Sequence, residues 1–180
     1  MARTADELVA MLKGIELRSR QEAAGLPQKQ DATQYWEGIV FNVVGSRFVV
    51  ALDEVAEILN EMPVLTRVPG AKAWIRGVAN IRGNLLPIAD LQAFLGGRQI
   101  VIGRRSRVLL INSEGINVGL LVSNVLGMRH IPETGKVDRI EVSQAVQPFL
   151  NGGFSQNGEE WPIFSMKKLA GNPEFQVASK

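Results

Sequence analysis

The chain repeats one pattern of short apolar segments and turn residues in its two halves. Residues 52–58 place apolar and polar positions in the same order as residues 122–128, which lie 70 positions later. The ten-residue spacing between a glycine and a Pro-Ile pair also recurs, from Gly77 to Pro87 and from Gly152 to Pro162. A duplicated pattern of this kind predicts two related structural units that share one core.

Most of the apolar segments have the length and composition of β-strands. The first two are residues 38–44 and 47–52, which are separated by Gly45-Ser46, a hairpin signal. Further strands are expected at residues 64–68, 78–81, 85–88, 108–111, 117–122, 126–131, 136–140, 150–155 and 161–165. Many short strands with frequent turns predict a mostly β fold of two small barrels, because closure into a barrel removes exposed edges.

Helices are expected only outside and between these strands. Residues 4–24 have apolar residues at helical spacing, and a polar linker of residues 28–34 follows. This helix either covers the domain's own apolar surface or binds a partner. Asp53 is a candidate N-cap for a helix over residues 54–60, and Asp90 begins another that ends at Leu95. A last helical turn at residues 166–169 ends at Gly171, and residues 172–180 are expected to form a tail.

The residue types present argue against an enzyme that depends on a metal or a reactive thiol. The chain has no cysteine and one histidine, His130, which is expected to be a surface or structural residue. Nucleophile-elbow, zinc-protease and phosphate-loop motifs are absent from the sequence. We therefore expect no catalytic residues and no cofactor. No apolar run is long enough for a membrane span, and the lack of cysteine fits a cytoplasmic protein.

Basic residues are concentrated in one connector, at Arg98, Arg104, Arg105 and Arg107. They either contact phosphate or an acidic partner or form a solvated connector. The net charge is only +2 and aromatic residues make up 6% of the chain, which does not favour nucleic-acid binding.

Residues 67–91 carry the most informative motif, with the sequence RVPGAKAWIRGVANIRGNLLPIADL. It closely resembles the signature of the CheW family: Val-Pro, then Gly-Val, then Asn-Leu-Arg-Gly, then Pro-Ile/Val-x-Asp-Leu. Residues 55–58 resemble the family's Val-x-Glu-Ile, and the likeness extends over residues 38–169. Ile81 stands where the family usually has leucine. The extension over residues 1–34 further resembles the PilI branch, which serves type IV pili and twitching.

The resemblance implies a fold of two intertwined SH3-like five-stranded β-barrels over residues 35–171. It also implies a non-enzymatic adaptor in a chemosensory array. The implied partners are the regulatory domain of a CheA-type histidine kinase and the cytoplasmic tip of a chemoreceptor, with no nucleic acid and no direct membrane insertion.

Two charged residues of the signature, Glu57 and Arg82, lie in otherwise apolar surroundings. We expect them to approach each other at the groove between the barrels and to orient the partners. The remaining candidates for partner binding flank them in the same motifs: Val55, Ile58, Asn80 and Gly83.

Three other functions compete with the adaptor. They are a nucleic-acid-binding β-barrel, a small enzyme whose site uses neither cysteine nor clustered histidine, and a regulatory piece of a larger kinase. The chain's own N-terminal helix and ending favour a separate chain over the last of these.

Overall fold

A computed structural model describes residues 34–111, 116–156 and 158–177, and β-strands account for most of their regular structure. The predicted mostly β fold is confirmed. The helix expected over residues 4–24 lies outside the described residues, and so does the expected linker except for its last residue.

The first sheet has six strands in the order β8-β1-β2-β11-β10-β9. This is one strand more than the five expected, because the two-residue β9 adds to its edge. Within this sheet, β11 and β2 form the parallel pair, and the other neighbouring strands are antiparallel. The strands are β1 (Tyr35–Val43), β2 (Ser46–Ala51), β8 (Asn124–Pro132), β9 (Lys136–Val137), β10 (Leu150–Gln156) and β11 (Glu159–Phe164).

The second sheet has five strands in the order β3-β6-β7-β5-β4. Its outer strands are β3 and β4, and β5 and β7 form its parallel pair. The strands are β3 (Val55–Leu59), β4 (Ile75–Ile81), β5 (Asn84–Asp90), β6 (Arg107–Ile111) and β7 (Gly119–Val122).

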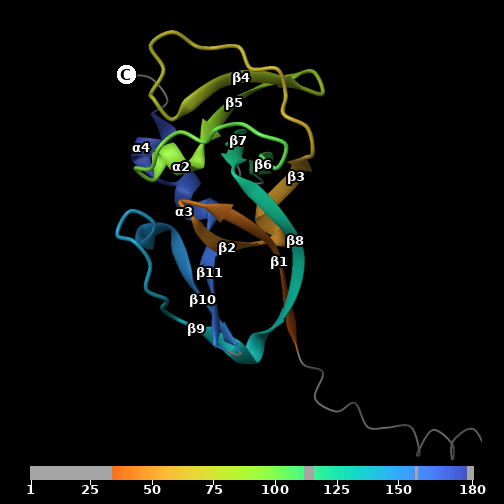
Figure 1. Cartoon of the computed structure of the whole chain (residues 1–180), viewed down its shortest axis with the longest axis vertical. Coiled ribbons are helices and arrows are strands. Elements are labelled where there is room, and N and C mark those ends of the chain that lie inside the picture. Colours follow the sequence, from red (N-terminus) through yellow and green to blue (C-terminus); the bar gives the residue numbers. More distant parts are fainter. Residues whose placement is uncertain (1–33, 112–115, 157, 178–180) are drawn as a thin grey trace, which may run out of the picture. The chain divides into compact units, whose positions relative to one another are not determined.

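The two sheets are intertwined because the chain leaves one sheet and later returns to it. It builds β1 and β2, then all of the five-stranded sheet, and then re-enters the six-stranded sheet through β8. In Figure 1, β8 runs from the region of β7 along β1. The six-stranded sheet is therefore built from two separate segments of the chain, and the whole five-stranded sheet lies between them in sequence.

The largest apolar cluster joins the two sheets into one core. It contains Phe41 and Phe48 of the six-stranded sheet together with Leu109 and Leu120 of the five-stranded sheet, all at most 1% exposed. Two smaller apolar clusters are also buried, one formed mainly by the five-stranded sheet and one by the six-stranded sheet. Each fully buried side chain of this size contributes ~1.5–3 kcal/mol through burial. One core thus joins the two sheets, and the correspondence of each sheet to one sequence repeat remains a prediction.

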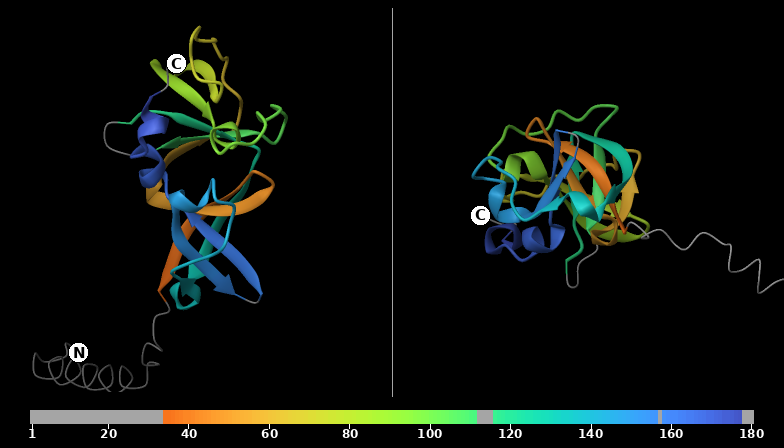
Figure 2. Two further views of the ribbon diagram at one scale, coloured as in Figure 1. Left: turned by 90° about the vertical axis from the view of Figure 1, so that its left-hand side faces the viewer. Right: turned by 90° about the horizontal axis from the view of Figure 1, so that it is seen from below.

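Short helices lie beside the junction of the sheets, as two further views show (Figure 2). Helix α2 (Leu91–Phe94) has the predicted N-cap, since Asp90 accepts a hydrogen bond from the Ala93 amide at 3.0 Å. Helix α3 (Met166–Ala170) ends before Gly171, as expected. Within the segment expected to be a tail, α4 (Pro173–Gln176) is helical. Its Phe175 is 6% exposed and stacks on Trp74, with ring centroids 5.3 Å apart.

The helix predicted over residues 54–60 is wrong. A single 3-10 turn, η1 (Leu52–Glu54), leads into β3, which pairs antiparallel with β6. The Glu54 carboxylate is buried and accepts hydrogen bonds from the backbone of Met166 and Lys167, at the start of α3. Glu54 therefore caps a distant helix and does not begin one of its own.

Two predicted strands are shorter than expected. Residues 64–68 form only an isolated bridge between Thr66 and Val78. The strand expected over residues 136–140 is limited to the two residues of β9.

Candidate functional site

The turn between β4 and β5 consists of two residues with left-handed backbone. Arg82 has a φ of 52° and Gly83 a φ of 87°, between the paired residues Ile81 and Asn84. Two positive φ values in a two-residue hairpin define a type I′ turn, whose twist matches that of the strands. The Asn80 side chain accepts a hydrogen bond from the Gly83 amide at 2.8 Å. Asn80 and Gly83 therefore build the turn that presents Arg82.

Arg82 forms an ion pair with Glu57, as predicted. The Arg82 Nη2 and Glu57 Oε1 atoms are 2.7 Å apart, and the two side chains are 77% and 30% exposed. Their predicted position at the groove between the barrels remains a prediction. Glu57 lies on β3 and Arg82 at the end of β4, which are the two outer strands of the same sheet. The pair therefore bridges the edges of the five-stranded sheet.

Two other predicted site residues pack into the interior. Val55 is 9% exposed in the core shared by both sheets, and Ile58 packs against that core. Their side chains pack β3 against the shared core. A direct contact of either residue with a partner remains a prediction.

Gly77, in the middle of the motif, allows a close approach of the backbone. It has a φ of 145°, and a Cβ atom at this position would lie 2.4 Å from the Thr66 carbonyl oxygen. A side chain here would therefore displace residues 64–68 from β4.

An exposed leucine near the turn is not among the site residues predicted from the sequence. Leu85 is 72% exposed and pairs across the hairpin with Asn80. Its neighbours Leu86 and Ile88 pack into the core of the five-stranded sheet. Because strand residues alternate between faces, this pattern already indicated that Leu85 points outward. Arg82, Glu57 and Leu85 together form what we call the hairpin surface.

A second group of exposed apolar residues lies on β8, which is an outer strand of the six-stranded sheet. Leu126 and Met128 are 49% and 53% exposed. The register with β1 shifts at Leu126, because Val40 pairs with Gly127 and Phe41 pairs with Val125. His130 is at the surface, as expected, and its Nε2 lies 2.9 Å from Glu37 Oε1.

The described residues contain no cluster of three histidine or acidic side chains that could hold a metal ion. Within the same part of the chain, no helix has the length and apolar character needed to cross a membrane.

Comparison with known proteins agrees with this geometry. The model of the CheW-like domain matches residues 37–174, which is most of the chain. The chain belongs to the CheW family. Members of this family are scaffold adaptors that couple chemoreceptors to a CheA-type kinase, and they are not enzymes. The predicted family and adaptor class are therefore confirmed.

Several CheW-family relatives differ in how much of the chain they match. The protein PilI of Pseudomonas aeruginosa is 42% identical over 166 residues, covering 92% of each chain. The chemotaxis protein CheW of Thermotoga maritima is 27% identical over 63% of this chain and 73% of its own. The solved scaffolding protein TtCheW from Thermoanaerobacter tengcongensis has a TM-score of 0.65 at 21% identity, covering 74% of this chain and 90% of its own. The last comparison supports the fold.

Proposed function

We propose that this CheW-family protein works in the cytoplasm and couples a chemoreceptor to a CheA-type histidine kinase in the system that controls type IV pili and twitching. Support for the twitching branch is the likeness to PilI, which extends over 92% of both chains. The finer partners are the regulatory domain of the kinase and the cytoplasmic tip of the receptor.

The observation that carries this proposal is the hairpin surface. An exposed ion pair contributes only ~0–1 kcal/mol to stability, so the fold has little need of it. The Arg82 guanidinium instead lies exposed at the end of the hairpin, where its planar group offers several N–H donors. Leu85, in the same hairpin, is 72% exposed. A charged pair next to an exposed aliphatic side chain suits recognition of another protein.

A second contact is proposed at β8, where an outer strand exposes Leu126 and Met128. An outer strand has unpaired backbone groups and can align with a strand edge of a partner. A standard interface would bury ~800 Å² on each partner. We propose that the kinase binds through such barrel edges.

Isothermal titration calorimetry tests the hairpin surface and the β8 contact separately. The full chain is titrated with the kinase regulatory domain and with the receptor tip, and then two variants are compared. Leu126→Asp/Met128→Asp should weaken kinase binding by at least about tenfold, since exposed apolar contacts become buried charges. Arg82→Ala should weaken binding of at least one partner to a comparable extent. Wild-type affinity of both variants for both partners would refute the proposed surfaces.

A further inference from the structure

A cationic groove lies away from the hairpin surface, between residues 65–76 and the connector after α2. It has a volume of about 390 Å³, and its lining includes Leu65, Arg67, Val68, Lys72, Arg76 and Gln99. No aspartate or glutamate lines it. The connector that forms one wall begins the arginine-rich segment for which the sequence leaves two interpretations open.

The charge of this groove is only partly compensated from within the protein. Arg76 Nη1 lies 3.6 Å from the Asp90 carboxylate, whose side chain is fully buried behind it. Within residues 34–111, 116–156 and 158–177, no ion pair is found for Arg67 or Lys72. Asp90 balances one of the three cationic groups, so about two positive charges remain to attract an anionic ligand.

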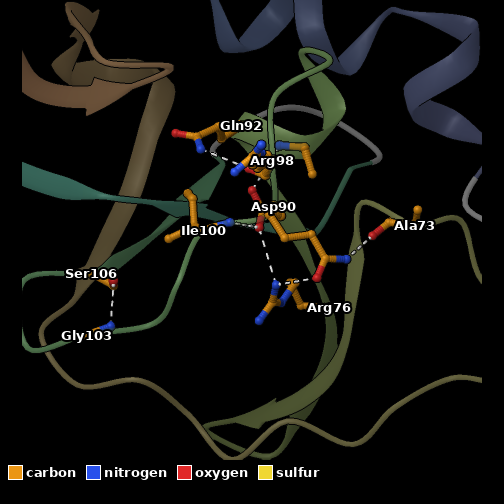
Figure 3. Close-up of polar contacts among 10 residues, drawn as sticks. Ala73, Arg76, Asp90, Gln92, Arg98, Ile100, Gly103 and Ser106 are labelled. Atoms are coloured by element: carbon orange, nitrogen blue, oxygen red, sulfur yellow. Dashed lines mark hydrogen bonds and ion pairs between the residues drawn. The ribbon is translucent and has the colours of Figure 1, made fainter.

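Hydrogen bonds hold the walls of the groove in one arrangement (Figure 3). Arg76 Nη1 donates to Gln99 Oε1 at 2.9 Å, and Gln99 Nε2 donates to the Ala73 carbonyl oxygen at 2.6 Å. The neighbouring Ile100 amide donates to Asp90 at 2.7 Å. Arg76 and Gln99 therefore hold the walls of the groove together before any ligand arrives, which reduces the entropy lost on binding.

We propose that the cationic groove is a docking site for an acidic segment of a partner protein. Aspartate or glutamate side chains would pair with Arg67 and Lys72, while an aliphatic side chain would contact Leu65 and Val68. The groove has no aromatic lining residue on which a nucleic-acid base could stack. Five of its nine lining residues are aliphatic, a composition that suits a peptide better than a phosphate backbone. This proposal does not depend on the signalling function proposed above.

The test uses the full chain and a fluorescein-labelled peptide of alternating glutamate and leucine. The matched control peptide has glutamine in place of glutamate. Fluorescence anisotropy should show binding of the acidic peptide that weakens as salt is raised, since exposed charges are screened. Equal binding of both peptides, or no binding of either at low salt, would overturn the proposal.

A pair of variants locates the binding. The double variant Arg67→Gln/Lys72→Gln, called the groove variant, should weaken binding of the acidic peptide on the order of tenfold. This loss corresponds to two exposed charge pairs. Lys136→Gln/Arg139→Gln removes the same charge from exposed positions around β9 and should have little effect. Equal weakening in both variants would mean nonspecific attraction and refute the site.

The wild-type protein and the groove variant also test two other possible ligands of the groove, a nucleic acid and a second copy of the chain. A single-stranded DNA that binds more tightly than the peptide, and is lost in the groove variant alone, would replace the proposal with a nucleic-acid site. A wild-type dimer in sedimentation that the groove variant converts to a monomer would replace it with a contact between two copies.

Discussion

Arg82 occupies a backbone conformation that favours glycine or asparagine. Its φ is 52°, and the same conformation recurs at Val44, with a φ of 53°, in the turn between β1 and β2. Left-handed backbone costs an L-residue ~1–2 kcal/mol, and a β-branched residue such as valine is especially unsuited to it. The two turns are therefore a matched pair: one presents the ion pair with Glu57, and the other does not.

Substituting asparagine in each turn separates stability from binding. Val44→Asn should raise the free energy of unfolding by about 1 kcal/mol and leave partner binding unchanged, because asparagine tolerates this conformation. Arg82→Asn should leave the unfolding free energy unchanged or up to about 1 kcal/mol higher, yet weaken partner binding. Urea unfolding and titration of the partners measure both. A clear loss of stability in Arg82→Asn would show that Arg82 is a structural residue.

The ion pair itself is tested by a double-mutant cycle. Glu57→Ala and Arg82→Ala should each shift the thermal midpoint by only a few degrees, since an exposed pair contributes ~0–1 kcal/mol. Binding of the partners should fall in each variant, and the double variant should lose less than the sum of the two. Strictly additive losses would mean that the two residues act independently.

At the scale of elements, Glu54 links the start of β3 to α3. Its buried carboxylate accepts from two backbone amides of α3 and lies 3.4 Å from the hydroxyl of Ser165. Glu54→Ala would leave these donors without a partner, which should lower the free energy of unfolding by ~1–3 kcal/mol. Glu61→Ala removes an exposed carboxylate and serves as the control. Urea unfolding that does not distinguish the two variants would contradict this account.

Segment length, composition and turn residues were sufficient to predict most strands, and Asp90 predicted the start of helix α2. The sequence prediction failed at residues 54–60, where Asp53 was a candidate N-cap of a helix. Pairing with β6 and the long-range contact from Glu54 to α3 decided that segment, and neither is visible in local sequence. Helix α4 was missed although Asn172 and Pro173 are local start signals, and its Phe175 packs on Trp74.

The candidate site was predicted in part. Glu57 and Arg82 were predicted to lie close together because each is a charged residue of the family motifs within an apolar segment. Their place on the edges of one sheet required the strand order, which spacing alone does not give. The cationic groove joins Arg67 and Lys72 to a residue from a separate connector, Gln99. Such a grouping arises only from the fold.

At the scale of the whole molecule, the C-terminal segment is expected to stabilise the shared core. Phe175 contacts the rings of both Trp74 and Phe94. Phe175→Ala should lower the free energy of unfolding by ~3–5 kcal/mol, as is usual when a buried aromatic side chain is removed. The exposed Val177 provides the control, since Val177→Ala should be nearly neutral. Equal stability of the two variants in urea would show that α4 is dispensable.

The central claim is that one chain holds receptor and kinase together. Vesicles carrying the receptor are mixed with kinase, with and without the protein, and sedimented. The account predicts that kinase sediments with the vesicles only when the protein is present, and that Arg82→Asn, although folded, reduces the amount sedimented. Kinase that sediments equally without the protein, or fails to sediment with it, would contradict the account.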